Sequence, residues 1–453
     1  EAGHSVGQTF VAHHGGLNGV EIWLEPGQFS RGTIQLHLKA SPQAENDLVI
    51  VALPLAQVEG PGFYRFSFPP RRNSHGKYFY AFLEVDSDTQ RHRMDCIRVG
   101  AGPGDVYLDG ALYYDHEPLE AQMTFRLIYA PGVIVLDLIG TAIRGLGLLA
   151  VSALLYIVPG WALLAWLWPE RLSWAEMLGL APGLSLALYP LLLLWTDLLG
   201  LHLGPLYAWL PVSGGFVALA WRYRTWRPRE GWRALQQWAR SKVVWPDLTF
   251  IFVMGLVFAV RLLVVRTLDA PLWGDSYQHT MMAQLLVDNG GLFDSWEPYA
   301  PYRSLTVHFG FPLATALFSW FTGLASLQAT FLVGQIINGL AVLTIYPLAV
   351  RLADGNRWAG IGAVLVAGLL SPVPADYVNW GRYAQLAGQV ILPVAICLLC
   401  ETVRTPITYG TASDWKVLLL AGATLAGMML NYYRAPFYYA AFFVAWLIAW
   451  MLP

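Results

Sequence analysis

Pro271-Leu-Trp-Gly-Asp-Ser-Tyr-Gln-His-Thr280 closely follows an apolar run, residues 248–266, that is long enough to cross a bilayer. A membrane-spanning helix needs about 20 mainly apolar residues. Asp275 and His279 lie four residues apart, so a helix places them on one face. Ionisable side chains at a membrane boundary are costly and mark candidate functional sites. A solvated loop with ordinary polar residues is the alternative interpretation.

The composition assigns the chain to the integral membrane proteins. Of its 453 residues, 56% are hydrophobic and only 13% are charged, whereas soluble proteins carry about 25% charged residues. The net charge of −2 argues against nucleic acid as a partner. The three cysteines, Cys96, Cys397 and Cys400, form no disulfide framework, and the last two lie in an apolar run as small apolar side chains.

The first 130 residues are polar and punctuated by glycine and proline, unlike the apolar remainder. Segments that alternate or are rich in β-branched and aromatic residues lie at 7–12, 19–24, 32–38, 48–52, 63–68, 77–83 and 123–129. Short strands separated by turn residues predict an antiparallel sandwich. We therefore expect an all-β domain over residues 1–130, and its strand order resembles the jelly-roll carbohydrate-binding modules. Its aromatic residues would either bind a glycan or pack its own core.

Further apolar segments predict a multi-span helical membrane protein. The candidate spans are 145–167, 176–199, 206–222, 248–266, 329–350, 358–373, 386–403, 415–430 and 435–451. Ahead of the first span, residues 133–143 are expected to form an interfacial lead-in helix. Residues 131–246 would then hold this helix, three spans and a basic loop, and residues 247–453 would form a membrane core.

Basic residues predict the orientation of these spans. The loop after the third span carries Arg222, Arg224, Arg227, Arg229, Arg233, Arg240 and Lys242. By the positive-inside rule this loop is cytoplasmic. Because three spans separate it from the N-terminal domain, that domain is expected to be extracytoplasmic, in a protein of the plasma membrane. One further span leads outward, so the loop 267–307 is also expected outside.

Counting membrane crossings in the same way leaves no crossing for residues 308–326. Arg351 and Arg357 flank a turn that is cytoplasmic by the same rule, so this apolar segment must begin and end outside. We predict that it is interfacial or re-entrant, because non-spanning backbone at membrane depth is tolerated where it is buried in protein or lines a wet cavity. The loop 267–307 then shares the outer face with residues 376–385 and 431–434.

Polar side chains in these three clusters suit a phosphorylated ligand. Asp275 and Asp376 could act as general bases or hold a divalent cation, Mg²⁺ or Mn²⁺. Arg382 and Arg434 break the positive-inside pattern, and bidentate recognition of phosphate oxygens would explain them. The candidate substrate-binding residues are Arg303, His308, Asp376, Trp380, Arg382, Tyr383 and Arg434. Arg261, near the outer end of its span, is expected to snorkel toward water, with phosphate contact as the alternative.

Motifs in the membrane core carry a family resemblance. Trp273-Gly-Asp-Ser-Tyr-Gln-His-Thr280, followed by Ala283-Gln-Leu-Leu286 and Glu297-Pro-Tyr299, resembles the first outer loop of GT-C class glycosyltransferases. Tyr346-Pro-Leu-Ala-Val-Arg-Leu352 and Gly381-Arg-Tyr383 resemble the later spans and the second outer loop. These membrane enzymes take sugars from polyprenyl-phosphate or polyprenyl-diphosphate donors. The resemblance covers about residues 247–451.

This resemblance implies a GT-C-like fold and transfer of a sugar to a glycan or protein acceptor on the outer face. Asp275 would be the catalytic base or a metal ligand, His279 would orient a substrate, and Asp376 would be a second acid. Membrane lipid and partner membrane subunits are the other expected partners.

Two further interpretations stay open. Relatives often carry an acidic pair where this chain has Asp275-Ser276, which favours a non-catalytic GT-C-like scaffold whose sandwich binds a glycan or a partner protein. A transporter is the third interpretation, although transport sites tend to lie near the midplane. The chain begins at Glu1 without a signal peptide, and we expect that one was cleaved. It ends at Pro453 directly after a predicted span, which favours a fragment or a shortened relative.

Overall fold

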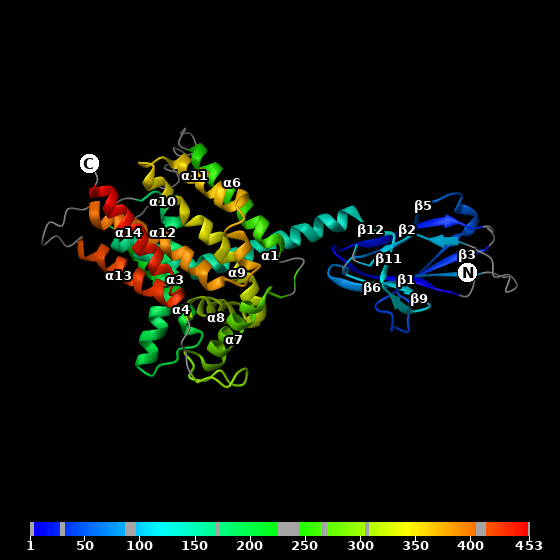
Figure 1. The fold of residues 1–453 in the computed structure, drawn as a ribbon, viewed down its shortest axis with the longest axis horizontal. Helices are drawn as coiled ribbons and strands as arrows, with labels where there is room; N and C mark the ends of the chain where they lie inside the picture. The colour runs from blue at the N-terminus through cyan, green and yellow to red at the C-terminus, as the bar shows by residue number, and fades with distance from the viewer. Residues whose placement is uncertain are drawn as a thin grey trace. The chain divides into compact units, whose positions relative to one another are not determined.

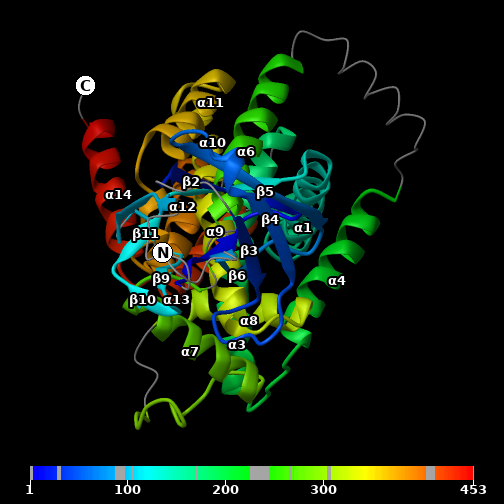
Figure 2. The same ribbon diagram turned by 90° about the vertical axis from the view of Figure 1, so that its right-hand side faces the viewer.

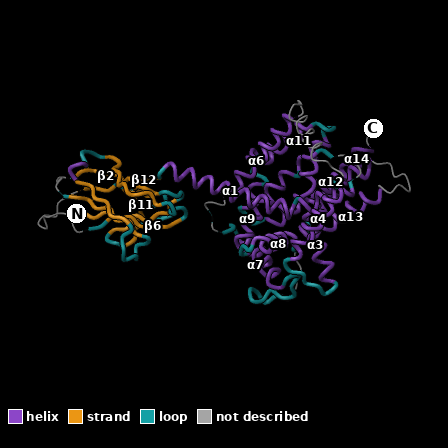
Figure 3. The backbone as a smooth tube through the Cα atoms, turned by 180° about the vertical axis from the view of Figure 1, so that it is seen from behind, coloured by secondary structure: helices purple, strands orange, loops and turns teal. Residues whose placement is uncertain are grey.

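The computed structural model describes residues 4–27, 32–86, 97–104, 106–107, 109–168, 172–224, 244–264, 268, 270–303, 308–404 and 414–451. The chain divides into two compact units, Glu1–Arg144 and Gly145–Pro453. Strands build the first unit and helices build the second (Figure 3). The predicted combination of an N-terminal β domain and a helical region with membrane-spanning candidates is confirmed.

The first unit consists of antiparallel sheets. Its strands are β1 (Val6–Ala12), β2 (Leu17–Pro26), β3 (Thr33–Lys39), β4 (Val49–Pro54), β5 (Gly62–Arg71), β6 (Lys77–Asp86), β7 (Ile97–Val99), β8 (Ala101–Pro103), β9 (Leu112–Tyr114), β10 (Glu117–Leu119), β11 (Ala121–Met123) and β12 (Phe125–Tyr129). One sheet has the order β10-β9-β1-β6-β3-β4 and another the order β12-β2-β5, with β7 also on β2 and a separate β8–β11 pair. Every predicted strand is present, and the three-residue strands β7 to β11 are additional.

Alternation along the strands explains how these sheets share one core. Ile34, Leu36 and Leu38 on β3 are buried, and the residues between them are partly exposed. Ile22 on β2 and Phe66 on β5 come from the other sheet and join the same apolar cluster. Because successive strand residues point to opposite faces, each sheet gives one apolar face to this core.

The second unit is helical. Its elements are α1 (Pro131–Tyr156), which begins in the first unit, α2 (Val158–Leu167), α3 (Trp174–Leu198), α4 (Leu206–Arg222), α6 (Val244–Val264), α7 (Gly274–Asn289), α8 (Gly310–Thr322), α9 (Ser326–Leu343), α10 (Ile345–Leu352), α11 (Arg357–Leu365), the π-helical turn η2 (Val366–Leu370), the 3₁₀ turn η3 (Ala375–Val378), α12 (Tyr383–Arg404), α13 (Asp414–Asn431) and α14 (Ala435–Met451).

Within the described residues, five stretches are long and apolar enough to cross a membrane. They are Pro131–Tyr156, Trp174–Leu198, Trp245–Val264, Ser326–Leu352 and Tyr383–Val403. The predicted spans 358–373, 415–430 and 435–451 correspond to shorter apolar helices, Arg357–Leu370, Trp415–Asn431 and Ala435–Ala449. The predicted span 206–222 corresponds to the 17-residue helix α4.

The first span begins earlier than predicted. Residues 133–143 are not a separate interfacial helix, because α1 runs unbroken from Pro131 to Tyr156. The break falls at Ile157, before α2. Pro159 has no N–H to donate to the carbonyl of Leu155, and the Tyr189 hydroxyl donates to that carbonyl instead, at 2.9 Å.

Ion pairs that are partly or fully shielded from solvent join helix ends at one end of the helical unit. Arg351 in the last turn of α10 lies 3.0 Å from Glu401 on α12 and 3.8 Å from Glu176 in the first turn of α3. Arg357 at the start of α11 pairs with Asp247 in the first turn of α6. Arg351 and Arg357 therefore lie close to the ends of α3, α6, α10, α11 and α12. Most of the basic loop that predicts the orientation, residues 225–243, lies outside the described residues.

The helices α7 and α8 lie side by side (Figures 1 and 2). The helix α8 also contacts α3, α4, α9, α12 and α13, and Gly310–Ser319 are all buried. Its 13 residues extend about 20 Å, less than the roughly 30 Å thickness of a hydrocarbon core. That 308–326 does not cross the membrane stays a prediction, and the length and burial of α8 suit it.

Candidate functional site

The backbone is strained just before Asp275. Trp273 has φ 70° and ψ 158°, a region that is essentially restricted to glycine and is stabilised only where the surrounding structure enforces it. The helix α7 begins at the next residue, with Asp275 in its first turn. The Asp275 side chain is exposed and makes no hydrogen bond or ion pair with any described residue. A free carboxylate therefore stands beside a strained turn.

His279 faces the opposite environment. It lies on the buried face of α7 with Ser276, Ala283 and Leu286 and is only 9% exposed. Burial, and secondarily the nearby His308, lowers the pKa of His279 to about 3, so its imidazole is neutral at physiological pH. The predicted helix is present, and Asp275 is exposed in its first turn while His279, one turn later, is buried.

Aromatic contacts centre on this buried histidine. The His279 ring centroid lies 5.3 Å from that of Phe311 on α8, 6.0 Å from Tyr383 and 6.3 Å from His308. His308 in turn lies 5.7 Å from Tyr432, in the turn between α13 and α14. These rings bring α7, α8, α12 and that turn together.

Both imidazoles leave one nitrogen unsatisfied. Nδ1 of His279 and Nδ1 of His308 are buried and have no hydrogen-bond partner among the described residues. Burial and the charge of Arg434 lower the pKa of His308. Two neutral histidines with free hydrogen-bonding capacity therefore lie beneath the exposed charges of the site.

Gly381 brings the second outer segment against α7. It has φ 65°, and a Cβ built there would lie 2.6 Å from Oγ of Ser276 and 3.2 Å from Cβ of Asp275. No other residue fits this close approach in a left-handed conformation. The neighbouring Arg382 is exposed, and its guanidinium carbon lies 4.8 Å from the ring centroid of Trp380. Arg382 and Trp380 are therefore neighbours of the Asp275 turn.

Arg434 presents a second exposed cation. Its Nε donates to the hydroxyl of Tyr433 at 2.9 Å, a contact that raises the pKa of Arg434. The Tyr433 ring lies 5.7 Å from that of His308. Asn431 fixes the turn, since its Nδ2 donates to the carbonyls of Leu186 and Gly427, each at 2.9 Å.

Most of the predicted site residues belong to one chain of contacts, and two do not. The contacts link Asp275, His279, His308, Trp380, Arg382, Tyr383 and Arg434. Arg303 is exposed and makes no hydrogen bond, ion pair or ring contact with another described residue. Asp376 lies on η3, half-buried, and its carboxylate has no described partner.

The predicted cation ligands do not form a metal cage. In the described parts of the chain, no group of three His, Cys, Asp or Glu residues is placed to hold a metal ion. Among those described residues, Asp275 and Asp376 have no further protein ligands placed to complete a dedicated cation site.

Residues 153–453 match a family that is described only as a family of unknown function, DUF6541. The chain belongs to the DUF6541 family. The matched region contains every candidate site residue and leaves out the β domain. No curated protein and no solved structure matches the chain.

Within the helical unit of this DUF6541 protein, the environment of Arg261 differs from the prediction. This side chain is only 6% exposed, and its Nε donates to Oδ1 of Asn338 at 2.8 Å. The prediction that Arg261 snorkels toward water was wrong, because protein acceptors satisfy the guanidinium inside the helical unit. A polar Asn338 within an apolar span is the sequence signal that could have revealed this.

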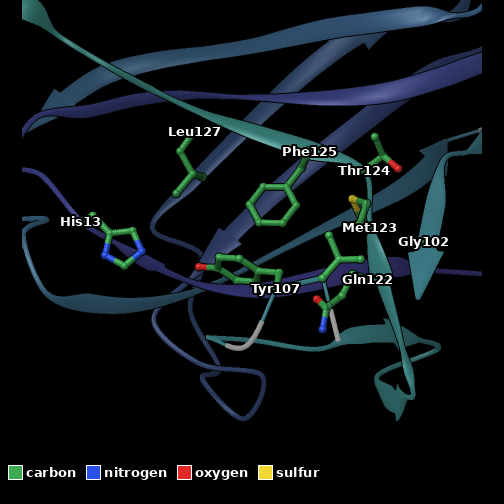
Figure 4. Close-up of a pocket in the computed structure, with 9 residues that line it drawn as sticks. His13, Gly102, Tyr107, Gln122, Met123, Thr124, Phe125 and Leu127 are labelled. Carbon is green, nitrogen blue, oxygen red and sulfur yellow. The ribbon is translucent and has the colours of Figure 1, made fainter. Parts of the chain in front are cut away.

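The β domain carries a hollow of its own (Figure 4). Its volume is about 390 Å³, and it is lined by His13, Gly102, Val106, Tyr107, Gln122, Met123, Thr124, Phe125 and Leu127. Tyr107 and Phe125 meet edge to face with centroids 5.4 Å apart. This hollow is a candidate ligand site of the first unit.

Proposed function

We propose that this DUF6541 protein transfers a sugar from a polyprenyl-phosphate or polyprenyl-diphosphate donor to a glycan or protein acceptor. The reaction would take place on the extracytoplasmic face of the plasma membrane. One observation carries the proposal: the free carboxylate of Asp275 lies in the turn against which Gly381 packs, next to the exposed Arg382. The helical unit supplies apolar surface for the lipid.

In the proposed step Asp275 takes the proton from an acceptor hydroxyl. The acceptor oxygen forms a bond with the anomeric carbon of the sugar, and the bond from that carbon to the phosphate oxygen breaks. The electron pair leaves with the polyprenyl phosphate, or with the polyprenyl diphosphate when the donor is diphosphate-linked. Arg382 and Arg434 would stabilise the negative charge on this leaving group, because cations aimed at developing charge lower the barrier.

Aromatic groups nearby suit the sugar. Trp380 and Tyr433 are exposed aromatic faces next to these arginines. His279 and His308 have unsatisfied Nδ1 atoms that are buried, so they would support the site from behind without contacting the sugar. Arg303 and Asp376 are left without an assigned role in the step.

The test uses the full chain in lipid nanodiscs with a panel of polyprenyl-phosphate-linked hexoses and pentoses, each supplied together with oligosaccharide and peptide acceptors. Release of polyprenyl phosphate is measured. Asp275→Asn should slow release by about 10²- to 10⁴-fold, the usual contribution of a general base. Asp288→Asn is the matched control, because Asp288 lies on the same helix and only accepts from Gln284 at 2.7 Å. Full activity of Asp275→Asn, or no release of polyprenyl phosphate from any donor, would overturn the proposal.

A non-catalytic role is the second candidate, and the hollow of the β domain favours it. A glycan would enter this hollow and contact Tyr107 and Phe125. An oligosaccharide array probed with the full chain tests the idea. Binding that is lost in Phe125→Ala but kept in Asp275→Asn would support it, and the absence of any bound oligosaccharide would exclude it.

A further inference from the structure

Arg261 is a buried cation inside a candidate membrane span. It lies in the last turn of α6 and makes no ion pair with a carboxylate of the described residues; its two hydrogen bonds go to neutral acceptors. An ionised side chain at membrane depth is expensive and is usually kept for function. Its bonding partners therefore indicate what it does.

The first partner is a carbonyl that its own helix cannot satisfy. Nη2 of Arg261 donates to the carbonyl of Gly368 at 2.9 Å. In an α-helix this carbonyl would accept from residue 372, but Pro372 has no N–H. The chain passes instead through the π-helical turn η2, closed by the Ser371 N–H on the Val366 carbonyl at 2.8 Å. Arg261 supplies the missing donor.

The second partner, Asn338 on α9, extends the contact toward the site. Its Oδ1 accepts from Nε of Arg261, and its Nδ2 donates to the carbonyls of Pro374 at 2.8 Å and Ala375 at 3.3 Å. Asn338 is completely buried. One amide group thus joins the buried cation to the start of η3.

Backbone hydrogen bonds connect the start of η3, which Asn338 holds, to the residues that pack against the first turn of α7, where Asp275 lies. The Arg382 N–H donates to the Tyr377 carbonyl at 3.0 Å, and the Gly381 N–H donates to the Val378 carbonyl at 3.3 Å. Gly381 then packs on Ser276. The segment 371–382 is therefore held at its base by Asn338 and at its tip by α7.

We propose that Arg261 and Asn338 are positioning residues that lock the segment 371–382, so that Arg382 is held beside Asp275. The role of that arrangement in binding phosphate rests on the proposed function, whereas the locking itself does not. Neither residue reaches the reacting groups; both act through the backbone of this segment.

Asn338→Asp separates the locking from mere packing. The aspartate keeps the size of asparagine and an oxygen for Arg261, so the buried cation stays satisfied. It loses the two N–H groups and sets an oxygen against the carbonyls of Pro374 and Ala375. The matched control is Asn356→Asp at the start of α11, where the side chain only accepts from the Trp358 N–H and aspartate caps equally well.

Two measurements on the full chain in nanodiscs test the proposal: hydrogen exchange of the 371–382 backbone, and the Kd for a polyprenyl monophosphate. Asn338→Asp should speed exchange in this segment by about tenfold or more, as loss of buried hydrogen bonds does, and raise the Kd by about tenfold. Arg261→Lys keeps the charge but not the two-pronged donor geometry, so it should shift both readouts in the same direction. Asn356→Asp should change neither.

The possible outcomes distinguish the locking of segment 371–382, its effect on the site and the proposed function. Unchanged exchange in Asn338→Asp would overturn the locking. Faster exchange with an unchanged Kd would overturn positioning of the site and leave a purely structural contact. If Asn338→Asp exchanges faster but the wild-type protein binds no polyprenyl monophosphate, the proposed function is overturned and the locking of segment 371–382 stands.

Discussion

The imidazole of His279 links stability to pH, because burial lowers its pKa to about 3 from about 6.5 in the unfolded chain. Between these two values the unfolded state binds more protons, so the free energy of unfolding falls as the pH falls from about 6.5 toward 3. Thermal unfolding in detergent should therefore show a weaker pH dependence in His279→Asn than in wild type. His202→Asn, at an exposed histidine, is the control for loss of an imidazole. Equal pH slopes for His279→Asn and wild type would contradict this.

At position 273 a glycine variant should be more stable than an alanine variant, the reverse of the order usual in helices. Its backbone conformation is one that glycine adopts freely, and a non-glycine residue there costs about 1–3 kcal/mol. Trp273→Gly should therefore unfold at a higher temperature than Trp273→Ala. At Tyr277, an exposed position inside α7, the alanine variant should be the more stable by about 1 kcal/mol. The same order at both positions would show that the turn holds no strain.

At the scale of elements, the contact between the second outer segment and α7 depends on one glycine. A methyl group at Gly381 would meet Ser276 and require a left-handed alanine. Gly381→Ala should lower the melting temperature and weaken binding of polyprenyl monophosphate together. Gly362→Ala in α11 is the control: that position has open space, and alanine there favours the helix by about 1 kcal/mol. A Gly381→Ala protein that binds as wild type would exclude this contact from the site.

Periodicity and length made the long elements predictable. Strand alternation predicted β3, and an apolar run predicted α6 with the Asp275 helix after it. The missed features depend on three-dimensional neighbours. Pro159 is a local signal for the break in the first span, but nothing local shows that Tyr189 satisfies the freed carbonyl, or that His279 is buried while Asp275 is exposed. The partners of Arg261 come from α9 and η2, far along the chain, so its position near the outer end of a span favoured snorkelling.

At the scale of the whole helical unit, two sets of helix ends differ in how their charges are satisfied. Arg351 and Arg357 form ion pairs with the buried carboxylates of Glu401 and Asp247, which hold helices together but leave little charge for a ligand. The Asp275 carboxylate has no described partner, and the guanidiniums of Arg382 and Arg434 contact only aromatic side chains among the described residues. Charged groups without a partner among the described residues are available to a substrate, which is why our proposal assigns the site to the second set.

The two sets of helix ends are expected to lie on opposite sides of the membrane. If α8 does not cross, residues on either side of it are reached from one side of the membrane. In a background without native cysteines, Tyr302→Cys and Leu327→Cys should both react with an impermeant maleimide on intact cells, since both positions are exposed. Leu352→Cys, at the end with the ion pairs, should react only after permeabilisation. Labelling of positions 302 and 327 from opposite sides would show that α8 crosses, and the inverse pattern at all three would place the site on the cytoplasmic face.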